Sequence, residues 1–505
     1  LVVTGANSAI GLADDLARFI DDMITREIDW SRLDRLVPEE HSAYWQTTLS
    51  FINDILRNWW PQILHERGLI EATLRRDRLI AAECARLTHH HDGPIIAAGS
   101  TGSMPATAKF LHAIARLKNG AVILPGLDRH LDEASWEAIA HVTSDDGAAT
   151  PSAAFSHPQF SLRGLLSRFN ITRDDVRDLA PPDTEGRELL MSETFRPAST
   201  THLWHAELQK ADVATSIAQG LQGISIISAA NAEDESLAIA AALREAHHFE
   251  RTAMLVTPDR ALARRVIAAL GRWNIEADDS GGDDVMETAA GRFALLSAQA
   301  ALSGLQPSVL LALLKHPLFR LGRASGEWNA AIAAFEHGIL RGPRPDQGTG
   351  GLLAAWKSFR EDLSRARRGD ASTLHHSDTR LALDEVALAD ADILVTQLAA
   401  CLVPLEACAG AKALPLAHIT QLHRDVIEAL SAEGDSNNVI DAFSSSDGLE
   451  LVESFDDLAQ ESEISALAFD ASEYADALPS IFAGRIVRRN GRPGARLRSL
   501  GPLEA

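Results

Sequence analysis

Two short apolar runs, separated by a glycine-rich turn and a helical pattern, form the clearest structural unit in the chain. Residues 95–98 are apolar without alternation, which is typical of a strand buried on both faces. A Gly-Ser-Thr-Gly-Ser turn follows at 99–103, and Pro105 then opens a helical pattern. A second apolar run covers 121–124. This order predicts a strand–loop–helix–strand unit of a parallel sheet, with its loop at the edge where open α/β sheets bind ligands.

Apolar residues at helical spacing fill the region before this unit. From residue 11 to residue 92 the pattern predicts helices, and one inward stripe runs from Trp45 to Trp59. The pair Trp59-Trp60 is a candidate base-stacking platform, but core packing of an amphipathic helix is the more common role of such residues.

A second block of alternating strands and helices begins near residue 223. Strands are predicted at 223–229 and 252–256, with a short return strand at 274–277. From 291 to about 440 the pattern is almost wholly helical. The polar, acidic composition of 430–465 predicts a mobile segment.

The chain therefore divides, on sequence, into five parts. We expect a helical insertion, the end of a first sheet domain with its connector, the start of a second sheet domain, a large helical insertion, and a return toward the second sheet. Their predicted bounds are 1–92, 93–220, 221–290, 291–445 and 446–505.

Composition limits the kinds of partner. The 505 residues carry a net charge of −23, so any contact with nucleic acid must be local. The three cysteines are too few and too scattered for a disulfide framework, which favours a reducing cytoplasm. No strictly apolar run reaches the roughly 18 residues of a membrane span. Because residue 1 is not Met and lies inside an apolar run, we expect a piece of a longer protein.

Residues 1–11 resemble the cofactor turn of short-chain dehydrogenases, with Ala9 where the second glycine belongs. Such enzymes need a Tyr-x-x-x-Lys pair. The only tyrosines, Tyr44 and Tyr474, are followed four residues later by Thr48 and Leu478. A nicotinamide-dependent oxidoreductase is therefore a remote alternative.

The chain lacks the motifs of nucleotide hydrolysis. A P-loop needs Gly-Lys, and this dipeptide is absent. No predicted strand ends in the adjacent acidic pair that an ATPase uses for magnesium and water. The loop at 99–103 offers glycines and hydroxyls without a lysine, so Ser100, Thr101 and Ser103 are candidates for contacting a DNA phosphate. A tight turn without a ligand is the alternative.

Several segments together resemble the AddB family of alphaproteobacteria, the second subunits of AddAB helicase–nucleases. The resemblance lies foremost in Gly93–Thr107 and Gly120–Asp128. Five shorter stretches fall in the family's order: 36–40, 157–160, 255–265, 313–318 and 501–505.

The resemblance implies two RecA-like domains of the superfamily 1 helicase type, with large helical insertions. It also implies work in DNA double-strand-break repair and recombination, with DNA and the AddA motor subunit as partners. The family's nuclease domain, with its iron–sulfur cluster, would lie beyond Ala505. Three cysteines cannot supply that cluster, so we expect the cluster only in the full complex. The resemblance likewise implies that ATP and magnesium bind only in the full complex.

One departure from active helicases concerns the helix that follows residues 252–256. Active enzymes place an arginine near its start to touch the nucleotide, whereas here Thr257-Pro258 stands there and Arg260 is the nearest candidate. We therefore expect a non-hydrolysing scaffold with no catalytic, cofactor or metal residue of its own, and with Arg260 as a further candidate for contacting DNA. An ATP-dependent helicase whose P-loop lies upstream is the alternative.

Overall fold

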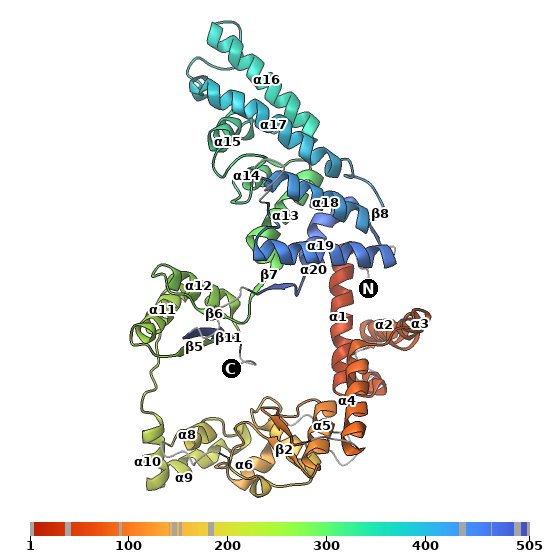
Figure 1. The fold of residues 1–505 in the computed structure, drawn as a ribbon, viewed down its shortest axis with the longest axis vertical. Coiled ribbons are helices and arrows are strands. Elements are labelled where there is room, and N and C mark those ends of the chain that lie inside the picture. The colour runs from red at the N-terminus through yellow and green to blue at the C-terminus, as the bar shows by residue number, and fades with distance from the viewer. Residues whose placement is uncertain are drawn as a thin grey trace. The chain divides into compact units, whose positions relative to one another are not determined.

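The computed structural model is mixed α/β and mostly helical, with small parallel sheets (Figure 1). It describes residues 5–35, 42–89, 93–140, 142–143, 149–150, 154–179, 186–433, 441–465, 467–488 and 496–501. The chain forms two compact units. One contains residues 14–226, and the other contains residues 2–13 and 227–505.

The first unit begins with helices, as the sequence predicts for residues 11–92. They include the part of α1 (Ala6–Thr25) that follows residue 13, and also α2 (Ser42–Asn53), α3 (Trp60–Glu66) and α4 (Ala72–His89). Between α2 and α3, residues Asp54–Trp59 form a π-helix rather than an α-helix.

The π-helix changes which tryptophan faces the core. A π-turn holds one more residue than an α-turn, so the inward stripe advances by one position after it. Trp59, predicted to face inward, is 59% exposed. Trp60 is half-buried instead, and its Nε1 donates to Glu71. The prediction of a core position for Trp59 is therefore wrong.

The predicted strand–loop–helix–strand unit is present in the first unit. Strand β1 (Ile95–Ala98) runs parallel to β2 (Gly120–Ile123), and α5 (Pro105–Ala115) connects them. Helix α7 (Phe160–Phe169) packs on the same face as α5, where Leu111 and Leu165 are buried. The opposite face of the strand pair exposes Ile96 and Ile123.

The rest of the first unit is a chain of short elements. They are β3 (Val142–Thr143), β4 (Ala149–Thr150), α6 (Glu133–Ala138), α8 (Arg187–Thr194), a 3-10 helix at Ala198–Leu203, α9 (Trp204–Leu208) and α10 (Ala211–Gly220). Helices α8 and α10 pack closely, since a Cβ on Gly186 would collide with the backbone of Ser216.

The predicted strand at 223–229 is wrong. These residues pair with no described strand, and Ile226 is 94% exposed. An apolar run becomes a strand only where a neighbouring strand completes its hydrogen bonds, and none of the described strands does so here.

The second unit contains a three-stranded parallel sheet in the order β5-β11-β6. Strand β5 (Ala253–Val256) matches its prediction, whereas the return strand β6 (Asp278–Asp279) comes slightly after the predicted 274–277. Strand β11 (Leu497–Leu500) arrives from more than two hundred residues later in the chain. Helices α11 (Ala232–His248) and α12 (Arg260–Gly271) pack on each other and on the sheet.

The remainder of the second unit is a large helical block with one continuous core. Its main helices are α13 (Ala289–Leu302), α14 (Pro307–Leu314), α15 (Asn329–Phe335), α16 (Gly348–Arg368), α17 (Glu385–Glu406), α18 (Leu416–Ser431), α19 (Ser446–Ser465) and α20 (Ala471–Ile481). Short strand pairs, β7 (Asp283–Asp284) with β10 (Ile486–Val487) and β8 (Leu414–Pro415) with β9 (Ala468–Phe469), tie its ends together.

Helix α19 lies within the segment predicted to be mobile. Leu451 and Phe455 of this helix are buried in the core of the helical block, so composition alone misled the prediction for its described residues. Residues 434–440 lie outside the described part.

Among the described residues, α17 is the one helix long and apolar enough by composition to cross a membrane. Its Leu388, Leu394 and Leu398 are fully buried against neighbouring helices. The core helix of a soluble protein passes the same test, so this helix gives no decision about a membrane.

Candidate functional site

The loop after β1 owes its shape to two glycines in the left-handed region. Gly99 has φ +82° and Gly102 has φ +63°. A Cβ on Gly102 would also collide with the side chain of Leu165 on α7. Between them, Ser100 Oγ accepts a hydrogen bond of 3.3 Å from the amide of Gly102. The loop is therefore a tight turn packed on α7, and Ser100 serves its internal geometry.

The rest of the loop faces the N-terminus of α5. Thr101 is half-buried and Ser103 is exposed, and neither hydroxyl bonds to a described residue. Met104 occupies the N-cap position without a side-chain cap, and Pro105 has no N–H. Helix N-termini carry partial positive charge and favour anions. Thr101 and Ser103 thus precede a helix turn that has no side-chain cap, and their contact with a DNA phosphate stays a prediction.

The side chain of Gln159, the residue before α7, holds the loop after β2 in place. Gln159 Nε2 donates to the carbonyl of Gly126 at 2.9 Å, and its Oε1 accepts from the amide of Asp128 at 3.1 Å. His157 holds Gln159 in turn and contacts the carbonyl of Phe195 at 2.6 Å. Residues 157–160, one of the stretches that resemble the AddB family, therefore have a structural role in this chain.

Both carboxylates after β2 are used within the fold. Asp128 Oδ1 accepts hydrogen bonds of 2.9 Å from the amides of His130 and Leu131. Asp132 caps α6 by accepting from the amide of Ser135 at 3.0 Å and from its hydroxyl at 2.9 Å. Oδ1 of Asp128 and both oxygens of Asp132 are therefore engaged within the fold.

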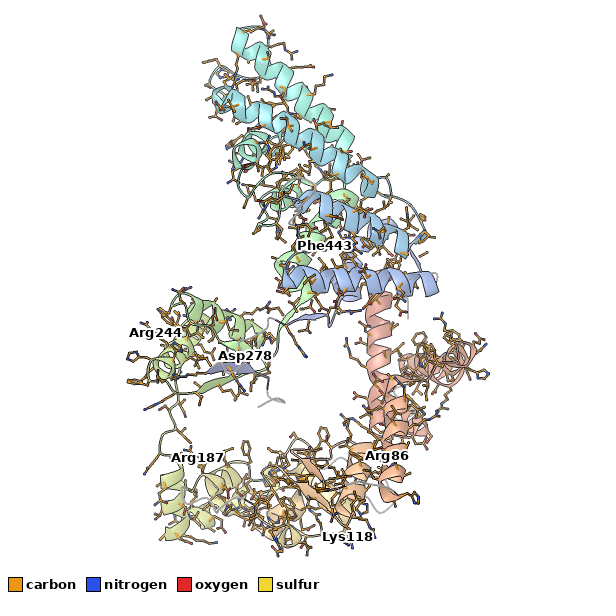
Figure 2. All side chains as sticks on the ribbon, in the orientation of Figure 1. Arg86, Lys118, Arg187, Arg244, Asp278 and Phe443 are labelled. Atoms are coloured by element: carbon orange, nitrogen blue, oxygen red, sulfur yellow. The ribbon has the colours of Figure 1, made fainter. Side chains whose placement is uncertain are left out.

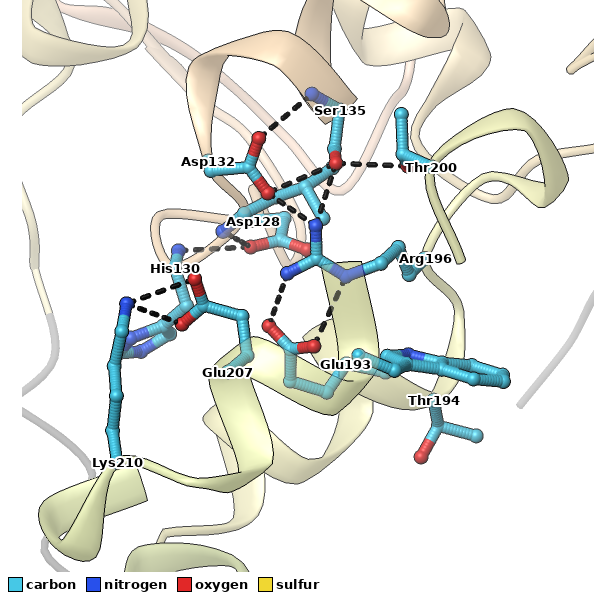
Figure 3. Close-up of polar contacts among 12 residues, drawn as sticks. Asp128, His130, Asp132, Ser135, Glu193, Thr194, Arg196, Thr200, Glu207 and Lys210 are labelled. Atoms are coloured by element: carbon cyan, nitrogen blue, oxygen red, sulfur yellow. Dashed lines mark hydrogen bonds and ion pairs between the residues drawn. The ribbon is translucent and has the colours of Figure 1, made fainter. Parts of the chain in front are cut away.

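Asp132 belongs to a buried polar cluster around Arg196, shown in Figure 3. Arg196 donates to Glu193 at 3.0 Å from Nε and 2.6 Å from Nη2, and it also contacts Asp132. Its Nη1 lies 2.7 Å from the hydroxyl of Ser135, which bonds to Thr200 at 2.9 Å. The Arg196 cluster, made of these five residues, joins α6 to α8 and the 3-10 helix that follows.

The electrostatics of the Arg196 cluster suit a structural ion-pair network rather than a catalytic site. Partial burial acts to raise the pKa of Asp132, but hydrogen bonds from Ser135 and Arg196 outweigh it and hold the pKa at about 2. The pKa of Arg196 is raised: burial opposes the shift, and the partners Glu193 and Asp132 more than offset it. A carboxylate held ionised by a paired arginine is a poor general acid or base at neutral pH.

In the second unit, Arg260 lies in the first turn of α12 at the carboxyl end of the sheet. Its guanidinium pairs with both oxygens of Asp279 and donates to the carbonyl of Gly282 at 2.7 Å. Gly281 leaves no room for a Cβ beside this guanidinium. The arginine is committed to joining α12 to the β6–β7 loop, and its contact with DNA stays a prediction.

A cavity of about 1200 Å³ lies beside α12 and the β6–β7 loop. Its lining carries more acidic than basic side chains: Glu276, Asp278, Asp279, Asp283, Glu287 and Asp447 against Arg264, Arg496 and His247. Such a surface repels phosphates, so it does not suit a nucleotide triphosphate or a DNA strand.

The proposed cofactor turn near the N-terminus has helical backbone instead. Residues 1–4 lie outside the described part, and α1 begins at Ala6, so Asn7–Gly11 of the resemblance are in a helix. The amide of Ala6 is satisfied by Glu473 Oε2 at 3.0 Å. A dinucleotide turn requires an open loop and free amides at that place.

The predicted site residues lie in two different places, and none of them belongs to the Arg196 cluster. Ser100, Thr101 and Ser103 do lie together at one loop, whereas Arg260 belongs to the other unit. The Arg196 cluster gave no signal, because its members are isolated polar residues and its bonded pairs are up to 65 positions apart. In the described part, no group of three or more His, Cys, Asp or Glu side chains is arranged to hold a metal ion.

Comparison with known proteins gives no family: no family model and no curated protein matches the chain.

Proposed function

We propose that this chain is a non-hydrolysing, helicase-like scaffold of a DNA-repair helicase–nuclease, of the AddB type. In this proposal the two small parallel sheets belong to two RecA-like domains, and the large helical block is an insertion into the second. The chain guides DNA in the cytoplasm and pairs with an AddA-type motor, which supplies ATP hydrolysis and translocation.

One observation carries the proposal: Asp128, Asp132 and Arg260, which follow the parallel strands β2 and β5, each bond to groups of the fold itself. Asp128 and Asp132 cap local backbone, and Arg260 is held by Asp279. An NTPase needs a free lysine and a free carboxylate at these ends, to bind phosphates and magnesium. In this proposal the two small parallel sheets keep a structural role and the motor subunit supplies the chemistry of hydrolysis.

DNA contact is assigned to the loop after β1. Its hydroxyls at Thr101 and Ser103 and the uncapped first turn of α5 are the described groups that suit a backbone phosphate. Such contacts carry no sequence information, so the proposal expects binding that depends on salt rather than on base sequence.

The experiment combines pull-down and ATP hydrolysis. The chain is co-expressed with an AddA-type motor subunit, and the complex is isolated through a tag on either partner. We expect a stable pair whose ATP hydrolysis is abolished by mutating the motor's P-loop lysine and is unaffected by Arg260→Gln. Failure to copurify with the motor, or DNA-stimulated ATP hydrolysis by this chain alone, would contradict the proposal.

The upstream-P-loop alternative is tested by the same assay. If the full-length protein hydrolyses ATP without the motor subunit, the chain is part of an active helicase instead. No described contact favours the nicotinamide alternative, because Ala6–Gly11 are helical.

A further inference from the structure

The two carboxylates between α3 and the middle of α4 both bond to neighbouring side chains. Glu71 accepts the indole N–H of Trp60, which fixes the turn. Asp77 pairs with Arg76 at 2.9 Å, and Arg76 also donates to Thr25 of α1. Residues 67–78 contain no other acidic side chain. Asp77 is therefore paired with a cation, whereas Glu71 keeps its charge and is held by a neutral donor.

Three other arginines in the same segment have no described carboxylate partner. Arg67, Arg75 and Arg78 are exposed, and none makes an ion pair or a side-chain hydrogen bond with any residue that the structure describes. Most described arginines of this acidic chain are instead held by a carboxylate, as Arg86 on the same helix is held by Glu83 at 2.7 Å. Figure 2 shows Arg86 projecting from α4.

Helical geometry places two of these cations together. Arg75 and Arg78 are three residues apart, which puts their heads on neighbouring positions of one face, separated by a rise of about 4.5 Å. Leu79 and Ala82 of the same face are exposed and uncharged. The exposed face of α4 thus presents positive charge without a competing free carboxylate between Arg75 and Ala82.

We infer that the exposed face of α4 that carries Arg75 and Arg78 is a docking surface for the phosphate backbone of DNA. The inference rests on the proposed function and adds a second contact to it, separate from the loop after β1. A chain of net charge −23 repels polyanions except where cations are locally unopposed. Unpaired guanidiniums bind phosphate bidentately and release counterions when they do so.

The test measures DNA affinity against salt concentration for the whole chain. A labelled duplex is titrated by fluorescence anisotropy with wild type and with Arg75→Gln/Arg78→Gln. We expect the double variant to bind about tenfold more weakly at about 50 mM salt, with a log–log salt slope lower by about two. Arg75→Lys/Arg78→Lys keeps the charge and is expected to retain most of the affinity.

The matched control is Arg168→Gln/Arg177→Gln, which removes two other exposed, unpaired arginines of the same unit. This variant has the same net charge and should bind like wild type. If both double variants lose affinity equally, or neither does, the α4 surface is wrong while DNA binding by the chain stands. If wild type binds no DNA, the proposed function itself fails. Loss of motor binding with unchanged DNA affinity would assign the surface to a protein partner and overturn the inference.

Discussion

The guanidinium of Arg196 and the carboxylate of Glu193 form a two-pronged ion pair, with Nη2–Oε1 at 2.6 Å and Nε–Oε2 at 3.0 Å. The Arg196 side chain is almost wholly buried, and Glu193 is buried with it. Because this arginine also reaches Asp132 and Ser135, it fixes α8 against the region that follows β2.

Removing Arg196 should therefore destabilise the first unit. We expect Arg196→Met to cost about 3–5 kcal/mol, because the buried Glu193 and the partly buried Asp132 both lose their cationic partner. Urea unfolding followed by the fluorescence of Trp136 and Trp204, which lie in this region, measures the change. The control Arg168→Met, at an exposed and unpaired position, should change stability by less than about 0.5 kcal/mol. Equal stability of the two variants would mean that the Arg196 cluster does not form.

The two adjacent tryptophans should differ in their contribution to stability. Trp60→Phe removes the hydrogen bond to Glu71 and part of a packed ring, so we expect a loss of about 1–3 kcal/mol. Trp59→Phe at the exposed position should be nearly neutral. Thermal unfolding of the two variants side by side measures this difference. A larger loss at Trp59 would show that the helix continues without the π-turn.

The sequence predicted strands correctly where an apolar run is bounded by a glycine or by a helical pattern. The strands at 95–98, 120–123 and 253–256 lie within a residue or two of their expected places. The wrong predictions concern features that the local sequence pattern does not determine. The strand at 223–229 needed a partner that no described strand provides, and the position of Trp59 depended on a single inserted residue in a π-turn.

The candidate site was predictable only in part for the same reason. A glycine-rich loop before Pro105 is a local pattern, so the loop after β1 could be found from sequence. The commitment of Arg260 to Asp279 depends on how α12 meets β6, and spacing does not reveal it. The Arg196 cluster depends on contacts between residues about sixty positions apart.

His423 makes the helical block sensitive to acid. Its ring is fully buried and contacts Ser297, Tyr474 and the carbonyl of Ala294. Burial lowers the pKa of His423 from its usual 6.5 to about 4, although the bond to Ala294 acts in the opposite direction. The unfolded chain therefore binds the proton more readily than the folded one between these two pH values.

Folding stability contributed by neutral His423 should be fully present above pH 6.5 and fall as the pH drops toward about 4. The loss amounts to about 3 kcal/mol when the shift is converted at 1.36 kcal/mol per unit. Urea unfolding of the second unit at several pH values measures it. His423→Asn should flatten the dependence in this window, although it starts from lower stability. An unchanged slope in this variant would mean that another group titrates.

Ser103 offers a test in which stability and DNA binding change in opposite directions. An aspartate there puts negative charge next to the uncapped N-terminus of α5, which should leave the melting temperature equal or raise it slightly. The same charge repels a backbone phosphate, so Ser103→Asp should bind DNA several-fold more weakly. Ser103→Asn, which adds similar bulk without charge, is the control. Equal DNA affinity in all three proteins would remove Ser103 from the contact surface.

We propose that this chain holds DNA without using ATP. The most direct measurement is the affinity for a labelled duplex between about 50 and about 200 mM salt, with and without Mg-ATP. We expect binding that weakens steeply with salt and is identical in the presence and absence of nucleotide. DNA affinity that changes when Mg-ATP is added, or no DNA binding at the lowest salt, would contradict the account.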